Sequence, residues 1–409
     1  MGVTEPAALA LACAKARSLS KETPKSVEVT INSGIYKNAF TCGIPGTEEV
    51  GNAFAAALGC LCGDPERGLY VLDGVTEQNV AESRRFIEEG RVKVNIGEIT
   101  SELFIRAVVK TENDVCEARI RHSHTNIDYL CKNGRVLLDA GETACSRDSG
   151  QAEELSIGAY TLEQMYNYAM TVPVGEMDFI REAFDMNLEL ADAGFSNRRC
   201  RLTKSLLDAG GGRDTGNAER TAVLLTSAAV EARVLGLDLP AMSVTGSGNH
   251  GIICTLLLYA AHRQIRCDEE LLLRATALCV LVTMYIKEYS GKLSAFCGCA
   301  IAGGTGAACG LSVLYGGGFS EVERTLCNMA NSIVGMICHG GNQGCVMKVI
   351  SAVKTAFSAC ELAMDGAYAP PEHGICGATP EETMRNIGYI AVPGMVETEK
   401  AVIDILRRK

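Results

Sequence analysis

Short apolar runs with a period close to two occupy much of the first third of the chain. The stretch at residues 26–31 alternates apolar and polar positions like a half-buried β-strand, and four later runs resemble it. Asn, Asp and Gly clusters between the runs supply turns. The predicted strands cover residues 26–31, 91–96, 103–111, 115–127 and 135–139, and the predicted helices around them cover residues 4–17, 48–61 and 76–90. We therefore expect an N-terminal mixed α/β domain, residues 1–150, with a mainly antiparallel sheet.

Beyond a polar stretch at residues 145–155, the pattern becomes helical and stays so. Several helices are apolar on every side, as in "ATALCVLVTMYI", which is typical of a helix at the centre of a domain. The predicted helices cover residues 161–170, 176–193, 217–235, 249–263, 268–288, 320–337 and 344–365, with two more near the C-terminus. The expected fold class is α+β. Residues 151–409 form a larger all-helical domain with a buried central helix, on which the first helix of the chain can also pack.

The charge balance limits the classes of partner. The formal net charge is −11, and the basic residues form no run interleaved with aromatic side chains. Nucleic acids and membrane surfaces both require basic patches, so we expect neither as a partner. The uncharged stretch at residues 293–320 is rich in glycine and is interpreted as buried helix and loop rather than as a membrane span.

Cysteine is unusually frequent, with 19 residues. We expect no signal peptide before them, because residues 1–17 lack a basic start and place Glu5 early. Many cysteines in a large chain without a leader fit a reducing cytosol. Most are then small buried hydrophobes, and a few are metal ligands or nucleophiles. The expected location is the cytoplasm.

Three glycine-rich segments, at residues 244–252, 292–310 and 335–348, interrupt the helical part. In the first, "TGSGNHG" precedes an apolar helix, so backbone N–H groups and the helix dipole could hold a carboxylate or a phosphate. No Gly-Lys-Ser/Thr follows, which excludes a P-loop. On the residues alone, a tight turn capped by Asn249 is the favoured interpretation.

The other two segments carry Cys297, Cys338 and Cys345. Their spacing is not that of a zinc ribbon, because paired C-x2-C knuckles are absent from the sequence. Three thiolates on glycine loops without a fourth suit a [4Fe–4S] cluster with one iron left open, which is a Lewis acid for substrate oxygen or sulfur. Buried thiols at helix ends explain the spacing equally well. A structural metal site or a zinc hydrolase is a further alternative for the same cysteines.

A series of motifs in one order gives the chain a family resemblance. They are "TEPAALALA" at the start, "IPGTEEVGNAFAAALG", "HTNI", "MSVTGSGNHGI", "KLSAFCG" and "GMICHGGNQGCVMK". Over nearly its whole length the chain resembles the L-cysteine desulfidases, relatives of the iron–sulfur L-serine dehydratase α domain. The resemblance implies a [4Fe–4S]-dependent α,β-elimination without pyridoxal phosphate. L-cysteine would give sulfide, ammonia and pyruvate, and L-serine would give water in place of sulfide.

The resemblance also implies a set of site residues. Cys297, Cys338 and Cys345 match the cluster ligands. The catalytic candidates are Glu5 and His250, and the substrate-binding candidates are Thr4, Lys37, Asn38, His124, Thr125, Asn126, Ser247, Gly248 and Asn249. The alternative for His124 is a strand-end histidine bonded to backbone, and for His250 a solvated loop residue. The expected partners are a small L-amino acid and, by the common occurrence of dimers, a second copy of the chain.

One position departs from the family motif Gly-Cys-Thr-Glu-Pro, because this chain has Val3 where relatives have cysteine. Relatives also carry a helical leader before this motif, so we expect either a truncated chain or a natural paralogue. A valine can neither ligate iron nor move a proton. The alternative function is therefore a degenerate relative that binds an amino acid without converting it.

Overall fold

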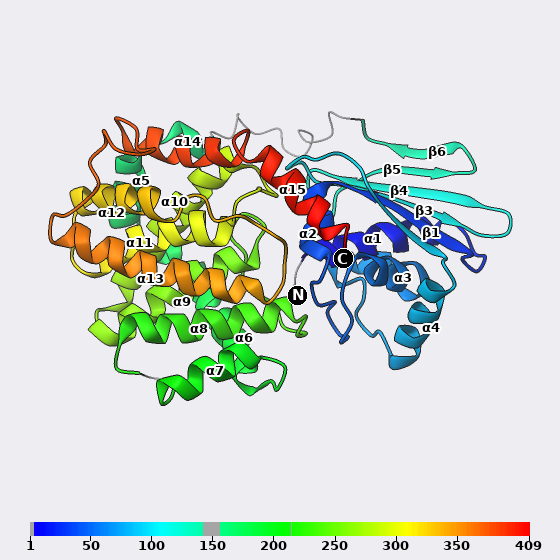
Figure 1. Cartoon of the computed structure of the whole chain (residues 1–409), viewed down its shortest axis with the longest axis horizontal. Helices are drawn as coiled ribbons and strands as arrows, with labels where there is room; N and C mark the ends of the chain where they lie inside the picture. Colours follow the sequence, from blue (N-terminus) through cyan, green and yellow to red (C-terminus); the bar gives the residue numbers. More distant parts are fainter. Residues whose placement is uncertain (1–3, 142–155, 214) are drawn as a thin grey trace.

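The computed structural model describes residues 4–141, 156–213 and 215–409. Figure 1 shows two parts that lie side by side. One is a sheet with helices packed against it, and the other is a larger body of helices. In chain order, the elements are α1 (Thr4–Ser18), β1 (Ser26–Ile31), α2 (Ser33–Ala39), α3 (Asn52–Cys62), η1 (Pro65–Tyr70), α4 (Glu77–Glu88), β2 (Val92–Ile96), β3 (Phe104–Lys110), β4 (Val115–Arg121), β5 (Ile127–Lys132), β6 (Arg135–Asp139), η3 (Ile157–Ala159), α5 (Leu162–Thr171), η4 (Val174–Met177), α6 (Phe179–Ser196), α7 (Arg201–Gly210), α8 (Ala218–Val234), α9 (Gly248–Ile265), α10 (Glu269–Ser290), η5 (Cys299–Gly303), α11 (Gly304–Leu314), α12 (Phe319–Ser332), α13 (Gly344–Met364), α14 (Pro380–Ala391) and α15 (Val396–Leu406).

The sheet has the strand order β2-β1-β3-β4-β5-β6. Strands β1 and β2 are parallel, and the other four neighbouring pairs are antiparallel. Every second residue of β1, namely Val27, Val29 and Ile31, is buried under α1 and α3, which cover one face. The mainly antiparallel sheet predicted from the sequence is confirmed.

The helical part is built around α9, α10 and α11, and all residues of α11 are buried. Small residues let these helices approach closely. A Cβ at Gly310 would lie 2.8 Å from the carbonyl oxygen of Ala275 on α10. The uncharged stretch is therefore helix and loop inside the protein, as predicted. Among the described residues, no helix combines the length and the apolar character needed to cross a membrane.

Two predicted elements are wrong in extent. The strand predicted at residues 115–127 is a hairpin of β4 and β5, with His122 at a φ of 66° in the connection. The helix predicted at residues 320–337 ends at Ser332, and Gly335, at a φ of 128°, begins an extended segment. Glycine accommodates this backbone conformation without the steric cost that a Cβ would add.

The last helix joins the two parts of the chain. Although α15 follows the helical part in sequence, it packs against α2 of the sheet part (Figure 1). The boundary predicted at residues 150 and 151 lies outside the described residues. Because α15 spans the junction, α2 and the cysteine segments of the helical part are held next to each other.

Candidate active site

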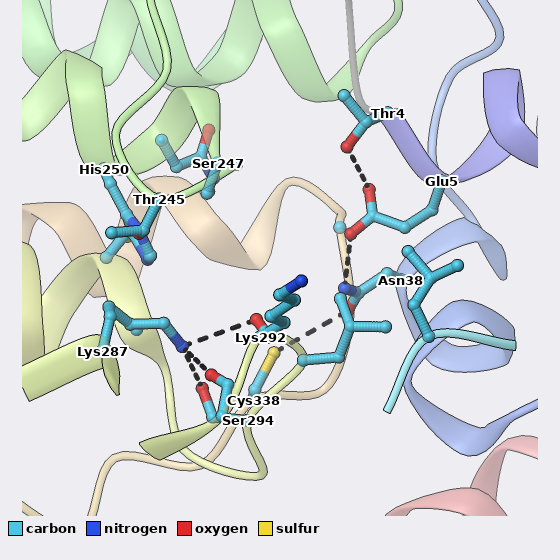
Figure 2. A pocket seen from close by; sticks show the side chains of 18 of the residues that line it. Thr4, Glu5, Asn38, Thr245, Ser247, His250, Lys287, Lys292, Ser294 and Cys338 are labelled. Carbon is cyan, nitrogen blue, oxygen red and sulfur yellow. Dashed lines mark hydrogen bonds between the residues drawn. The ribbon is translucent and has the colours of Figure 1, made fainter. Parts of the chain in front are cut away.

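A cavity of about 660 Å³ lies where the two parts meet. Its walls come from α1, α2 and the β4–β5 hairpin, and from the three glycine-rich segments of the helical part. Figure 2 shows side chains of both parts directed toward the same space. The predicted site residues that line the cavity are Thr4, Glu5, Asn38, His124, Ser247, Asn249, His250, Cys297, Cys338 and Cys345.

Two of the cysteine segments are joined by main-chain hydrogen bonds. The Cys297 N–H donates to the carbonyl of Met336 at 2.8 Å, and the Cys338 N–H donates to the carbonyl of Ala295 at 2.7 Å. The residues between them form an isolated antiparallel bridge. Backbone pairing fixes the position of each Cα, so the two thiols face one cavity although they are far apart in sequence.

The third cysteine begins the first turn of α13, after a loop held by its own side chains. The carbonyl of Asn342 accepts from the Cys345 N–H at 2.9 Å, and its Oδ1 accepts from the Gly344 N–H at 2.9 Å. Gln343 donates from Nε2 to Glu231 Oε1 at 3.2 Å, which fastens the loop to the buried end of α8. The glycine loop is thereby a rigid support for its thiol.

The three thiols influence one another electrostatically. Burial, together with negative charge on Cys297 and on Cys338, raises the pKa of Cys345 to about 11. The pKa of Cys297 is lowered, chiefly because the Cys299 thiol, 3.9 Å away, donates to its sulfur. Three thiolates in one buried space would repel each other, so their joint ionisation requires a cationic partner.

The fit of this sulfur set to a metal group can be tested on the structure. Among residues 4–141, 156–213 and 215–409, no three His, Cys, Asp or Glu side chains are grouped closely enough for one metal ion. A single tetrahedral zinc ion therefore does not fit the arrangement as it stands. An iron–sulfur cluster is a larger unit bound by thiolates alone, and the donor set here consists of sulfur.

Lys348 supplies an independent observation. This residue lies on α13, one turn after Cys345, and is buried, and its Nζ has no hydrogen-bond partner within the described part of the chain. Its positive charge lowers the pKa of both Cys297 and Cys345, so it lies near the thiols. A buried unpaired ammonium costs several kcal/mol. An anionic group held by the three thiolates would compensate it, so the residues fit an iron–sulfur cluster.

His250 presents a lone pair to the cavity. The Thr245 hydroxyl donates to the carbonyl of Val244 at 2.7 Å, and the same hydroxyl oxygen lies 2.8 Å from His250 Nδ1. Nδ1 also lies 3.1 Å from that carbonyl, so Nδ1 carries the proton and Nε2 does not. Burial lowers the pKa of His250 to about 3, which keeps the ring neutral at pH 7. A Cβ at Gly298 would lie 2.6 Å from Nε2, so glycine keeps this atom accessible.

A line of polar contacts runs from the sheet part to the cysteines (Figure 2). Glu5 accepts from Thr4 Oγ1 at 3.2 Å and from Asn38 Nδ2 at 2.8 Å. The Cys338 thiol lies 3.9 Å from Asn38 Oδ1. His124 Nε2 lies 3.5 Å from Thr4 Oγ1, and burial lowers the pKa of this histidine. The carboxylate of Glu5 thus lies in the cavity wall opposite the segment 244–250.

The first glycine-rich segment meets a buried guanidinium. Arg233 of α8 donates from Nη1 to Asn249 Oδ1 at 3.0 Å, while its Nε has no partner within the residues described. A Cβ at Gly248 would lie 2.5 Å from this Nε. Ser247 precedes α9 without capping it through its side chain. A guanidinium beside a helix N-terminus suits a carboxylate ligand.

Four predicted site residues do not line the cavity. Lys37 is fully buried and pairs with Glu399 of α15. Thr125 is exposed on the hairpin, and Asn126 donates from Nδ2 to a backbone carbonyl within it. Gly248 is buried behind its neighbours at the start of α9.

Three cations at the site were missed from the sequence: Lys287, Arg233 and Lys348. Lys287 donates from Nζ to the carbonyl of Gly291 at 2.6 Å and to the Ser294 hydroxyl at 3.1 Å. Burial lowers its pKa to about 8. The available signal was a basic residue next to apolar positions within each helix, because a charge that such a position buries requires a partner or a ligand.

The fold and the cavity together describe an α+β protein with a sulfur-lined site at the junction of its two parts. The family model "Serine dehydratase alpha chain" matches residues 66–404. The chain belongs to this family, which confirms the resemblance found in the sequence.

Several relatives match almost the whole chain. A "UPF0597 protein" of Clostridium botulinum (strain Okra / Type B1) is 39% identical over 409 residues, covering 99% of this chain and 95% of the relative. A protein of the same name prefix from Clostridioides difficile (strain 630) is 34% identical, covering 99% and 96%. Another, from Parabacteroides distasonis, is 36% identical, covering 100% and 95%. Val3, where the family motif has cysteine, lies outside the described residues.

Proposed function

We propose that this protein is a [4Fe–4S]-dependent lyase that removes sulfide from L-cysteine by α,β-elimination, with L-serine as the second candidate substrate. Family membership supports a serine dehydratase-like function. The observation that carries the proposal is the meeting of Cys297, Cys338 and Cys345 in one cavity beside the unpaired Lys348. The three thiols would hold the cluster, which when bound supplies a Lewis-acidic iron for the leaving group.

The cavity has groups for both charges of a small zwitterion. We assign the substrate carboxylate to Arg233, whose unpartnered Nε would gain a charge-assisted hydrogen bond. On the opposite wall, the Glu5 carboxylate can accept from the substrate ammonium. Thr4 and Asn38 hold that carboxylate in place through their hydrogen bonds. A substrate amino acid that is bound through both its carboxylate and its ammonium is oriented for proton removal at its α-carbon.

His250 is the base that we assign to this proton. Its Nε2 is unprotonated and directed at the space kept clear by Gly298, and Thr245 and Val244 hold the ring through Nδ1. An imidazole must be unprotonated before it can accept a proton, and burial, which lowers its pKa to about 3, ensures this across the physiological range.

Replacing His250 with glutamine should lower kcat by about 10²- to 10⁴-fold, the usual contribution of a general base. Iron and sulfide content should remain unchanged, because the ring contacts neither Met336 nor Ala295, which position the cysteines. The measurement is the anaerobic release of pyruvate and sulfide. His262→Gln on the same helix is the matched control, since this ring lies near Cys267 at the far end of α9. Equal activity of the two variants would remove His250 from the mechanism.

Replacing Lys348 with methionine should have opposite effects on the two forms of the protein. Without the cluster, the variant should be more stable than the parent, because a buried unpaired charge is removed. With the cluster, it should lose iron to a chelator faster, because the anionic group loses its counter-charge. Thermal unfolding and chelation rates measure both effects. Lys354→Met, an exposed position of the same helix, should change neither, and a destabilised apo form of the Lys348 variant would contradict the assignment.

The test of the function itself is anaerobic reconstitution, followed by analysis of iron and sulfide and by assays with L-cysteine and L-serine. Four irons per chain with sulfide and pyruvate release would support the lyase. A ligand-induced rise in melting temperature without product would favour the alternative function, in which the protein binds an amino acid without converting it. A gain of turnover in the Val3→Cys variant would then show that the missing cysteine causes the loss of activity. One zinc per chain without inorganic sulfide would overturn the cluster.

A further inference from the structure

A second pair of thiols lies away from the cavity, between α12 and the segment that leads into α14. Cys327 and Cys376 are each partly exposed, and neither lines the cavity. The Cys376 sulfur lies 3.8 Å from the carbonyl oxygen of Cys327, and the interaction of the two thiols shifts the pKa values of both. These residues differ from the buried cysteines of the core because a small reagent in solution can reach them.

Asn331 joins the two cysteines. Its Nδ2 donates to the Cys376 sulfur at 3.1 Å and to the carbonyl of Cys327 at 3.1 Å. The sulfur thus accepts from an amide, and it lies shortly before the N-terminus of α14, where the helix dipole favours negative charge.

These contacts divide the roles of the two thiols. The pKa of Cys376 is lowered to about 7, chiefly by the hydrogen bond from Cys327, with smaller contributions from Asn331 and Thr383. The same hydrogen bond raises the pKa of Cys327. One thiol is therefore available as a thiolate near neutral pH, while its neighbour retains its proton. Thiolate character and exposure are the properties that make a cysteine reactive.

We propose that Cys327 and Cys376 form a redox-modification site that takes a small hydroperoxide as its substrate. The Cys376 thiolate attacks a peroxide oxygen, so that an S–O bond forms, the O–O bond breaks and the alcohol or water leaves with a proton. Cys327 then attacks the sulfenic acid; an S–S bond forms, the S–O bond breaks and water leaves. In sum, the two thiols lose two protons and two electrons, and the hydroperoxide is reduced.

The chain contains a matched internal control. The Cys279 sulfur likewise lies 3.8 Å from the carbonyl of Cys254, but both residues are buried and the pKa of Cys279 is raised by desolvation. Closeness of two thiols alone would oxidise both pairs equally. The proposal instead requires an exposed sulfur with donors, so only the pair of Cys327 and Cys376 should react.

The experiment treats the full-length protein anaerobically with one equivalent of hydrogen peroxide, then blocks the remaining thiols and maps the peptides by mass spectrometry. We expect a disulfide between Cys327 and Cys376, and a reduced Cys254–Cys279 pair. Before oxidation, iodoacetamide at pH 7 should label Cys376 at least about ten-fold faster than Cys62 or Cys267, which are also partly exposed but have raised pKa values.

Two variants separate the steps. Cys327→Ser should leave a sulfenic acid on Cys376 that dimedone traps, and Asn331→Leu should slow the labelling of Cys376 several-fold. Labelling no faster than that of Cys62, or equal oxidation of the buried pair, would overturn the proposal. Because the readout is the mass of two peptides, these results do not depend on the cluster or on lyase activity.

Discussion

Cys338→Ala should reduce the iron and sulfide content of anaerobically reconstituted protein from about four of each per chain to near zero, and turnover should disappear with them. The thiol is not needed for the fold, because the segment is held by the Cys338 N–H and the carbonyl of Ala295, which alanine preserves. The melting temperature of the cluster-free variant should therefore match that of the cluster-free parent. Iron and sulfide analysis, with the visible absorbance of the cluster, gives the result.

Cys299→Ala is the matched control for this experiment. Cys299 also lines the cavity, and its sulfur lies 3.9 Å from that of Cys297, yet it does not belong to the predicted ligand set. We expect this variant to retain its iron and sulfide. Full cluster content in the Cys338 variant, or its loss only in the Cys299 variant, would show that the ligand set is wrong.

Lys37→Met should lower the free energy of unfolding by about 3–5 kcal/mol, the usual cost of leaving one member of a buried ion pair uncompensated. Lys37 pairs with Glu399, and the two side chains are 0% and 6% exposed. Its Nζ also donates to the carbonyl of Ser294 at 3.0 Å, so the ammonium connects α2, α15 and the segment that leads to Cys297. The denaturant midpoint of the cluster-free protein measures the effect.

The pair offers two internal comparisons. The double variant Lys37→Met with Glu399→Gln removes both charges and should recover most of the loss. Lys93→Met breaks a pair with Glu28 that spans 3.0 Å but is 67% and 37% exposed, so it should cost less than about 1 kcal/mol. Equal costs for Lys37→Met and Lys93→Met would show that α15 is not held by this contact.

The sequence predicted most of the fold because most of its elements repeat a local pattern. Alternation at β1 and the apolar helices α9 and α10 follow from periodicity, which depends only on near neighbours in the chain. The hairpin between β4 and β5 was merged into one strand because "RHSHTNI" lacks the Gly and Asn-Gly signals of a tight turn. The early end of α12 depends on Gly335 and on pairing with a distant segment, which periodicity does not report.

The site residues, too, fall into those that local sequence identifies and those that only the packing of distant segments reveals. Cys297, Cys338, His250 and Asn249 were recognised through motifs that are contiguous in the sequence. Arg233 and Lys287 lie within helices that turn them toward the cavity, and Lys348 lies within α13, where its charge acts on the thiols of Cys297 and Cys345. Lys37 matched a motif as well, but in the structure its ammonium forms an ion pair with Glu399, which is far away in sequence. Motifs identify chemical groups, whereas packing decides which group faces the ligand.

The contact between α2 and α15 sets an order of events during synthesis. The residues of α1 and α2 that make one wall of the cavity precede the cysteine segments in the chain, and α15, the helix that fastens this wall to the cysteine segments, is the last of the described helices. Until α15 is made, Lys37 has no Glu399, and burying its charge is unfavourable. The two walls should therefore close only after translation of α15, so that any ligand of the closed cavity binds after this helix has been made.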